Sequence, residues 1–357
     1  MAFAQLTYRE SLRDIEACLR AVPTRLYHMG FRGKMARNTL AVANQKRDWR
    51  IYANFAYVLI ATAQKLYATE PWGLTLKRTV YALDSSTIDL CLSLFPWAKF
   101  RRRKGGIKLH TLLNVRTHIP SFLLVTPAKV HDVNVLDAII FEPGSVYIMD
   151  RAYVDYERLH RLHQSAAYFV TRPRKNFRFN RVYSHPVDPA TGVCSDQTVK
   201  LVTFYSAQSY PEHLRRIRFV DPETKKKLTF ITNNFAWSSA TIARLYKARW
   251  QVELFFKWIK QHLRIKAFFG TSENAVKTQI WISISVFVLV AILKKRLNLP
   301  QSQYEILQVL SVSLFEKVPV PELLAKTTWH ESQGESPNQL LLFDLHQERR
   351  EKVCCCC

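Results

Sequence analysis

Residues Tyr246 to Lys260 read YKARWQVELFFKWIK, and this segment carries the most specific pattern in the chain. It is typical of a long helix that Ser238 caps and that continues to about residue 262. At about 100° per residue, four polar side chains share an arc of roughly 60°: Tyr246, Arg249, Glu253 and Lys260. Such a stripe is either a solvated ion-pair face or a metal ligand flanked by phosphate contacts.

Two further carboxylates stand upstream, each directly after a short apolar run. Residues 79–83 (TVYAL) and 145–149 (SVYIM) favour β-strands, and Asp84 and Asp150 follow them. An aspartate in this place can be an ordinary turn residue. It can also lie at the carboxyl edge of an open α/β sheet, where such sheets place their sites. Three carboxylates on separate elements can hold two divalent cations about 4 Å apart, as phosphodiester chemistry requires.

Strands alternate with helices around these carboxylates, which is typical of an α/β layer. Other strand candidates are residues 107–115, 122–126 and 167–171, and residues 153–164 favour a helix. We therefore divide the chain into an N-terminal helical region (1–75), the first part of the core (76–175), a β-rich insertion (176–234), the last part of the core with C-terminal helices (235–330), and a linker with a tail (331–357).

The charge balance indicates a polyanionic partner. The 357 residues include 52 Lys and Arg against 28 Asp and Glu, a formal net charge of +24. This favours nucleic acid, although charge alone also allows an anionic membrane surface. The apolar run Ile280–Leu293 is shorter than the roughly 20 residues of a membrane span, so a buried core helix is the better interpretation. The spacing of Cys354 to Cys357 does not match a zinc site.

Together these motifs resemble those of the IS-four-type insertion-sequence transposases, a branch of the DDE transposases, over roughly residues 3–345. The signature Tyr-x₂-Arg-x₃-Glu-x₆-Lys of that family is met by Tyr246, Arg249, Glu253 and Lys260. The segments Asp84-Ser85-Ser86-Thr87 and Asp150-Arg151-Ala152-Tyr153 match its two aspartate motifs. The family also places a β insertion between the second aspartate and the glutamate.

The resemblance implies an RNase H-like mixed sheet flanked by helices, with a β-rich insertion before the last catalytic helix and an N-terminal helical DNA-binding region. It implies that Asp84, Asp150 and Glu253 are the catalytic residues and bind two Mg²⁺ or Mn²⁺ ions. It also implies that Tyr246, Arg249 and Lys260 contact DNA phosphates. We expect further phosphate contacts from three basic residues near the aspartates, namely Arg151, Lys108 and Arg103.

The implied activity is metal-dependent cleavage at the ends of an insertion sequence and strand transfer into target DNA. The implied partners are double-stranded terminal inverted repeats and target DNA, with a dimer in the DNA complex. We expect no membrane association and a location in the bacterial cytoplasm with the nucleoid. The alternative is a catalytically silent or truncated DNA-binding remnant, because relatives usually carry another helical stretch before the point that matches Phe3.

Two other groups allow a functional and a structural interpretation. His110, His131 and Asp132 could form a histidine metal site, but a structural or DNA-contacting role is favoured. Lys108 and His110 lie two apart on a predicted strand and so share a face. Trp237 could stack on an unpaired base, although its neighbours Phe235 and Ala236 favour core packing.

Overall fold

The computed structural model describes residues 1–27, 30–73, 76, 78–102, 104–263, 265 and 267–325. It comprises two compact units, Met1–Glu316 and Lys317–Cys357. In the second unit the described residues include one helix, α11 (Val320–Ala325). Arg103 and the cysteines at 354–357 lie outside the described residues, so the expectations for them stay predictions.

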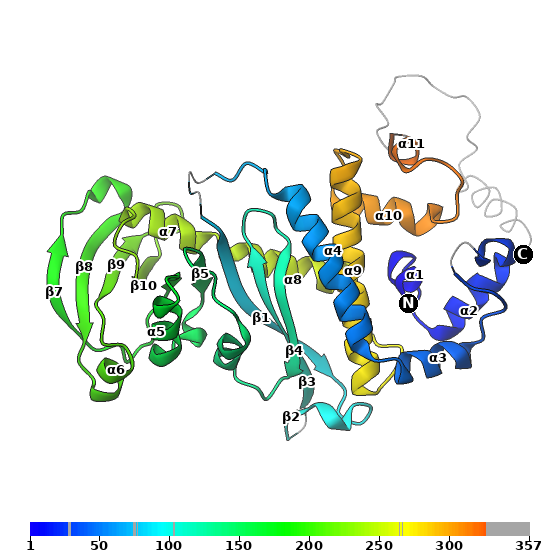
Figure 1. Ribbon diagram of the computed structural model, residues 1–357, viewed down its shortest axis with the longest axis horizontal. Helices are drawn as coiled ribbons and strands as arrows, with labels where there is room; N and C mark the ends of the chain where they lie inside the picture. Colours follow the sequence, from blue (N-terminus) through cyan, green and yellow to red (C-terminus); the bar gives the residue numbers. More distant parts are fainter. Residues whose placement is uncertain are drawn as a thin grey trace, which may run out of the picture. The chain divides into compact units, whose positions relative to one another are not determined.

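The first unit contains a ten-stranded mixed sheet (Figure 1). The strand order is β2-β3-β1-β5-β6-β10-β9-β8-β7, and β4 pairs with β3. The helices and this mixed sheet confirm the α/β fold class expected from the sequence. The strands are β1 (Val80–Leu90), β2 (Lys99–Arg101), β3 (Lys104–Asn114), β4 (Pro120–Pro127), β5 (Val146–Met149), β6 (Tyr168–Thr171), β7 (Phe179–His185), β8 (Val193–Leu201), β9 (Leu214–Val220) and β10 (Lys227–Thr232).

Three adjacent strands at the centre of the sheet run parallel. Strand β5 pairs with β1 up to Met149 and Leu83, and with β6 up to Ile148 and Val170. All four residues of β5 are almost fully buried, as is typical of a strand covered on both faces. The three strands therefore run in the same direction, and their carboxyl ends lie toward the same edge of the sheet.

The structure corrects the prediction that a strand ends at Asp84. Parallel pairing of β1 with β5 does stop at Leu83. The strand itself continues to Leu90, because β3 pairs antiparallel with it over the whole stretch from Tyr81 onward. Asp84 therefore lies inside a long strand, at the position where its parallel neighbour ends.

The strands of the expected insertion extend the same sheet. Strand β10 pairs antiparallel with β6 and with β9, and β8 and β7 follow outward. A continuous ladder of backbone hydrogen bonds thus connects the insertion to the core. The division of the chain into domains at 75, 175, 234 and 330 stays a prediction.

Helices pack against the strands of the sheet (Figure 1). Helix α7 packs on β5 and β6, and α8 packs on β1 and β3. Ser238 caps α7 as expected, since its side chain accepts a hydrogen bond from the Thr241 backbone N–H. The helices of the first unit are α1 (Ala2–Leu6), α2 (Leu12–Ala21), α3 (Arg37–Lys46), α4 (Trp49–Tyr67), α5 (Tyr156–Gln164), α6 (Phe204–Ser209), α7 (Ser239–Lys247), α8 (Trp250–His262), α9 (Glu273–Arg296) and α10 (Gln303–Ser313).

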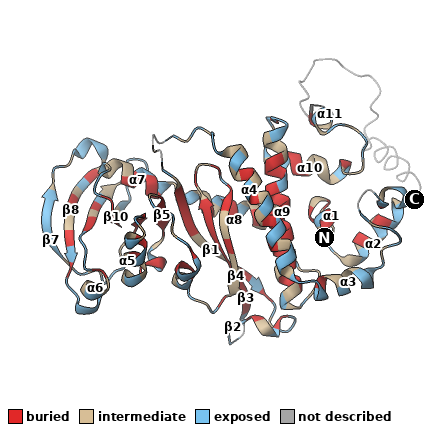
Figure 2. Cartoon of the chain, in the orientation of Figure 1, coloured by how far each residue is buried: buried red, intermediate tan, exposed pale blue. Residues whose placement is uncertain are grey.

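Helix α9 contains the apolar run that could have been a membrane span. It has 24 residues and is long and apolar enough to cross a membrane, but 83% of its most apolar window is buried inside the protein. Figure 2 shows buried residues along most of its length. Helix α4 packs along it, with Trp49 stacked on Trp281 and the Tyr67 hydroxyl donating to the Ala291 carbonyl. Packing against neighbouring helices therefore accounts for its apolar composition.

Candidate active site

Parallel pairing brings the two predicted aspartates to one place. Leu83 of β1 is paired with Met149 of β5, and Asp84 and Asp150 are the next residues of the two chains. Asp84 is about one-fifth exposed, and its Oδ1 accepts a hydrogen bond from the Ser85 backbone N–H at 2.8 Å. Asp150 begins the 3₁₀ turn Arg151–Tyr153. The two side chains therefore meet at one edge of the central sheet, although they are far apart in the sequence.

The segment that carries Glu253 is not the single long helix expected from the sequence. Helix α7 ends at Lys247 and α8 begins at Trp250. Between them the bonds tighten to a spacing of three residues, since the Arg249 N–H donates to the Tyr246 carbonyl and the Val252 N–H to the Arg249 carbonyl. Tyr246 consequently precedes the break and Glu253 follows it. The predicted arc of four side chains is wrong as a feature of one regular helix.

Arg249 connects two of the three carboxylates across this break. Its Nη1 lies 2.9 Å from Asp84 Oδ2, and its Nη2 forms an ion pair with Glu253. Its Nε is buried and, among the residues described, has no hydrogen-bond partner. The guanidinium thus holds α8 against β1 and places Glu253 beside Asp84.

The electrostatic environment of Asp84 shows that negative charge is concentrated here. Burial raises the pKa of its carboxyl group, and the nearby charges of Glu253 and Asp150 raise it further. The Ser85 N–H and Arg249 lower the same pKa. Three carboxylates and one guanidinium therefore share a small volume, and the carboxylates act against each other's ionisation while Arg249 favours it.

The other residues of the sequence signature lie around this centre. Lys260 donates from its ammonium to the Thr87 carbonyl of β1 at 3.0 Å. Tyr246 is mostly buried, packs against Phe230 with ring centroids 4.9 Å apart, and has a pKa raised by burial. Arg151 is exposed beside Asp150. All of these positions are close to the carboxylates in the fold, but only Arg151 presents a freely exposed side chain.

A second polar cluster joins Asp132 to residues of β1 and β3. Asp132 accepts from the Ser85 hydroxyl at 2.7 Å and forms an ion pair with Lys108 at 3.1 Å. His110 is fully buried, and its Nε2 shares a hydrogen bond with the Thr126 hydroxyl. Its Nδ1 lies 3.9 Å from Asp132 Oδ1. Lys108 and His110 do share a face, as expected. Their contacts show a structural cluster that ties the loop at Asp132 to the strand of Asp84.

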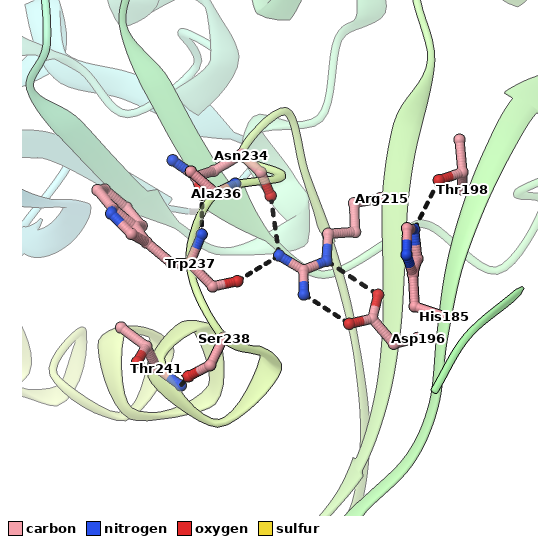
Figure 3. Close-up of polar contacts among 9 residues, drawn as sticks. All are labelled: His185, Asp196, Thr198, Arg215, Asn234, Ala236, Trp237, Ser238 and Thr241. Carbon is pink, nitrogen blue, oxygen red and sulfur yellow. Dashed lines mark hydrogen bonds and ion pairs between the residues drawn. The ribbon is translucent and has the colours of Figure 1, made fainter. Parts of the chain in front are cut away.

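A buried ion pair fixes the loop that leads into α7 (Figure 3). Arg215 of β9 binds Asp196 of β8 through two hydrogen bonds, of 2.9 and 2.5 Å, and both side chains are almost fully buried. The same guanidinium donates to the carbonyls of Asn234 and Trp237. The Asn234 side chain in turn accepts from the Trp237 N–H. Strands β8 and β9 thereby hold the loop from which α7 begins, and α7 leads to Arg249 and α8.

Comparison with known proteins identifies the family. A family profile described as "Transposase DDE domain" matches residues 75–289, more than half of the chain and the part that contains all three carboxylates. The chain belongs to the DDE transposase family. The transposase is therefore an enzyme that acts on DNA, and its core is RNase H-like. A second profile, for a domain of unknown function, matches residues 1–32.

Relatives of the transposase include proteins of insertion sequences. A transposase of Sinorhizobium fredii named y4zB is 34% identical over 265 residues, which cover 72% of this chain and 71% of the relative. A transposase of insertion sequence element IS5377 from Geobacillus stearothermophilus is 30% identical over 61% of this chain and 57% of its own length. A cryo-EM structure of the piggyBac transposase synaptic complex with hairpin DNA has a TM-score of 0.41, with 10% identity over 78% of this chain and 63% of that one. Membership of the IS-four branch stays a prediction.

DDE transposases use divalent metal ions, and the donor chemistry at this site suits them. Asp84, Asp150 and Glu253 offer the oxygen ligands that hard cations prefer. Among the described residues, no three acidic, histidine or cysteine side chains are spaced to hold an ion as they stand. Asp84 and Glu253 are both paired with the Arg249 guanidinium instead.

The sequence did not reveal one basic residue at this edge. Arg172 follows β6, and the pairing of Ile148 with Val170 places it level with Asp150 two residues farther on. Its charge, like that of Asp150, affects the pKa of Tyr246. Arg172 is the first residue after the predicted strand 167–171. Its position next to Asp150 follows only from the order of the parallel strands.

Proposed function

We propose that the transposase cleaves DNA at the ends of an insertion sequence and transfers the freed 3′ ends into target DNA, a cut-and-paste reaction. One observation carries the proposal: Asp84 and Asp150 lie at the same level of adjacent parallel strands, with Glu253 held beside them by Arg249. Asp84, Asp150 and Glu253 would be the catalytic residues and would hold two Mg²⁺ or Mn²⁺ ions. Such ions activate water or a 3′-hydroxyl and stabilise the leaving oxygen.

The chain's own residues would bind and orient the DNA. We infer that Arg249 exchanges its carboxylate partners for a phosphate, since guanidinium binds both groups through paired hydrogen bonds. Lys260 and Lys108 would supply point charges near the scissile phosphate, and exposed Arg151 beside Asp150 needs no rearrangement to contact DNA. Tyr246 would contact a phosphate through its hydroxyl, and Arg103 would extend the basic surface.

The substrates would be double-stranded terminal inverted repeats and target DNA. Two ends of one element must be brought together, so we propose a dimer in the DNA complex. The net charge of +24 supports this assignment, because neutralising phosphates drives non-specific and specific binding. The reaction would take place in the bacterial cytoplasm at the nucleoid, without a membrane.

The test is a cleavage assay on DNA that carries the gene's own flanks, with Mg²⁺ or Mn²⁺. Asp150→Asn should lower the cleavage rate by about 10³-fold, because metal-ion catalysis contributes several kcal/mol. Asp89→Asn is the matched control, since Asp89 is an exposed residue on the same strand as Asp84. Equal rates in Asp150→Asn and Asp89→Asn would refute the assigned site. Binding without metal-dependent breaks in the wild type would favour the silent DNA-binding remnant.

A further inference from the structure

A basic segment connects the catalytic edge of the sheet to the insertion. Residues 172–181, between β6 and the first part of β7, read RPRKNFRFNR. They include five basic residues and no acidic one: Arg172, Arg174, Lys175, Arg178 and Arg181. Phe177 and Phe179 lie between them and stack with ring centroids 5.1 Å apart. The aromatic pair packs against the hydrophobic core and anchors the segment, while its basic side chains other than the half-buried Arg172 are exposed.

The segment begins at the catalytic centre. The β5–β6 register pairs Ile148 with Val170, so Arg172 stands level with Asp150 at the end of the neighbouring strand. From there the chain leads away into β7, the outermost strand of the sheet. A ligand bound along this segment would therefore extend outward from the carboxylates.

The charges of this segment are not neutralised by the protein. Arg174, Lys175 and Arg178 are all exposed, and among the described residues none of them forms an ion pair. Arginines close by behave differently: Arg158 and Arg161 on α5 are both paired with Asp137. Basic side chains without ion pairs at this density produce a local positive potential that attracts an external anion.

A polar cavity of about 300 Å³ opens beside these charges. Arg174, Asn176 and Arg178 line it from one side, and Thr203 and Ser206 line it from α6 and the residue before it. Two carboxylates also border it: Asp155, which is occupied by Arg158 at 3.0 Å and by the N-terminus of α5, and the exposed Glu157. Guanidinium, amide and hydroxyl donors around one cavity are the groups that contact phosphate and sugar oxygens in DNA complexes.

We propose that residues 172–181 and this cavity bind the sugar–phosphate backbone of the DNA duplex next to the cleaved phosphate. The inference rests on the proposed function and adds a contact surface to it. The segment holds duplex DNA through charge and hydrogen bonds without reading its sequence, since phosphate contacts position a duplex and base contacts specify it. Because Arg172 lies beside Asp150, the bound duplex leads directly to the catalytic carboxylates.

The experiment measures the salt dependence of DNA binding by the full chain, in EDTA so that no cleavage occurs. The variant carries Arg174→Gln, Lys175→Gln and Arg178→Gln. The control carries Lys225→Asn, Lys226→Gln and Lys227→Gln, which removes the same number of exposed charges from the turn between β9 and β10 and from the first residue of β10. Asparagine suits Lys225 because its φ is +57°. Circular dichroism and melting curves confirm that both variants are folded.

The slope of log K against log salt is negative. If all three side chains contact phosphates, its magnitude should decrease by about 2.7, at about 0.9 for each contact. The control should keep the wild-type slope. In hydroxyl-radical footprints, the variant should lose protection only in the stretch that adjoins the cleaved phosphate. An unchanged slope, an equal loss in the control, or lost protection at a remote stretch would overturn this inference while leaving the proposed function intact. A wild-type protein that binds no DNA at any salt concentration would overturn both.

Discussion

At the scale of single residues, Arg249 is the most informative side chain of the proposed catalytic site. It forms ion pairs with Asp84 and Glu253, and less than a fifth of its side chain is exposed. A cation in this position reduces the repulsion between the carboxylates. Without it, Glu253 and Asp150 would raise the pKa of Asp84 further. We interpret it as the group that keeps the site assembled before DNA and metal ions bind.

This interpretation predicts the stability of an Arg249→Gln variant. Removing the guanidinium should lower the free energy of unfolding by about 2 kcal/mol, because two partly buried carboxylates lose a charged partner. Saturating Mn²⁺ should recover part of this loss. Urea unfolding with and without Mn²⁺ measures both effects. Arg244→Gln, which changes an exposed arginine on α7, is the control; equal stability of the two variants would contradict the prediction.

His110 makes a pH-dependent contribution that can be isolated. Burial lowers its pKa from 6.5 to about 4, with Lys108 lowering it further and Asp132 opposing the shift. The unfolded chain then binds a proton that the folded chain excludes, so the contribution is complete above pH 6.5 and is lost as the pH falls toward 4. Between these values stability should decrease by up to about 1.4 kcal/mol per pH unit. His110→Gln should flatten this decrease in unfolding experiments; an unchanged slope would show that His110 is not the group responsible.

At the scale of elements, the positions of Arg249 and Glu253 depend on how α7 and α8 pack against the sheet. The insertion contributes through Arg215, whose guanidinium binds Asp196 and the carbonyls of Asn234 and Trp237. The break between α7 and α8 then directs Arg249 toward Asp84. The strands from β7 to β10 thus help to position the helices around Arg249 and also extend the sheet.

The buried pair gives a testable prediction at this scale. Arg215→Met alone should destabilise the protein by about 3–5 kcal/mol, because it leaves the Asp196 charge buried and unpaired. Combining it with Asp196→Leu should recover most of the loss, since an apolar pair of similar volume avoids the desolvation cost. Urea unfolding of the two variants decides the point. A double variant no more stable than the single one would show that lost backbone contacts, and not the unpaired charge, dominate.

The catalytic elements could be predicted from sequence to the extent that local pattern determines them. Short apolar runs located β5 and the start of β1, so Asp84 and Asp150 could each be expected at the carboxyl edge of a sheet. The continuation of β1 past Asp84 depends on pairing with β3, which lies elsewhere in the chain. The break at Arg249 keeps helical dihedral angles and leaves no proline or glycine as a signal. The role of Arg172 depends on strand order, which no local pattern determines.

At the scale of the whole molecule, three carboxylates from distant parts of the chain meet in an excess of positive charge. The chain carries +24 overall, yet its acidic residues Asp84, Asp150 and Glu253 lie together at one edge of the sheet. This contrast suits an enzyme that attracts a polyanion and binds cations at the point where the polyanion is cut.

Metal ions should therefore stabilise the folded protein. At about 100 times the dissociation constant, Mn²⁺ or Mg²⁺ should add about 2.7 kcal/mol to the free energy of unfolding, because the unfolded chain lacks the assembled site. Melting curves at increasing metal concentration should show this shift in the wild type and in Asp89→Asn. In Asp150→Asn the shift should be much smaller. A shift of the same size in all three proteins would indicate binding elsewhere.

The most direct test of the account is to map where a metal ion binds along the chain. Fe²⁺ bound in place of Mg²⁺, with ascorbate and peroxide, generates hydroxyl radicals that cut the backbone near the ion. We predict cuts close to residues 84, 150 and 253, suppressed by excess Mg²⁺ and abolished by Asp150→Asn. Cuts at other positions, or the same cuts in the Asp150→Asn variant, would contradict the claim that these three carboxylates form one metal-binding catalytic site.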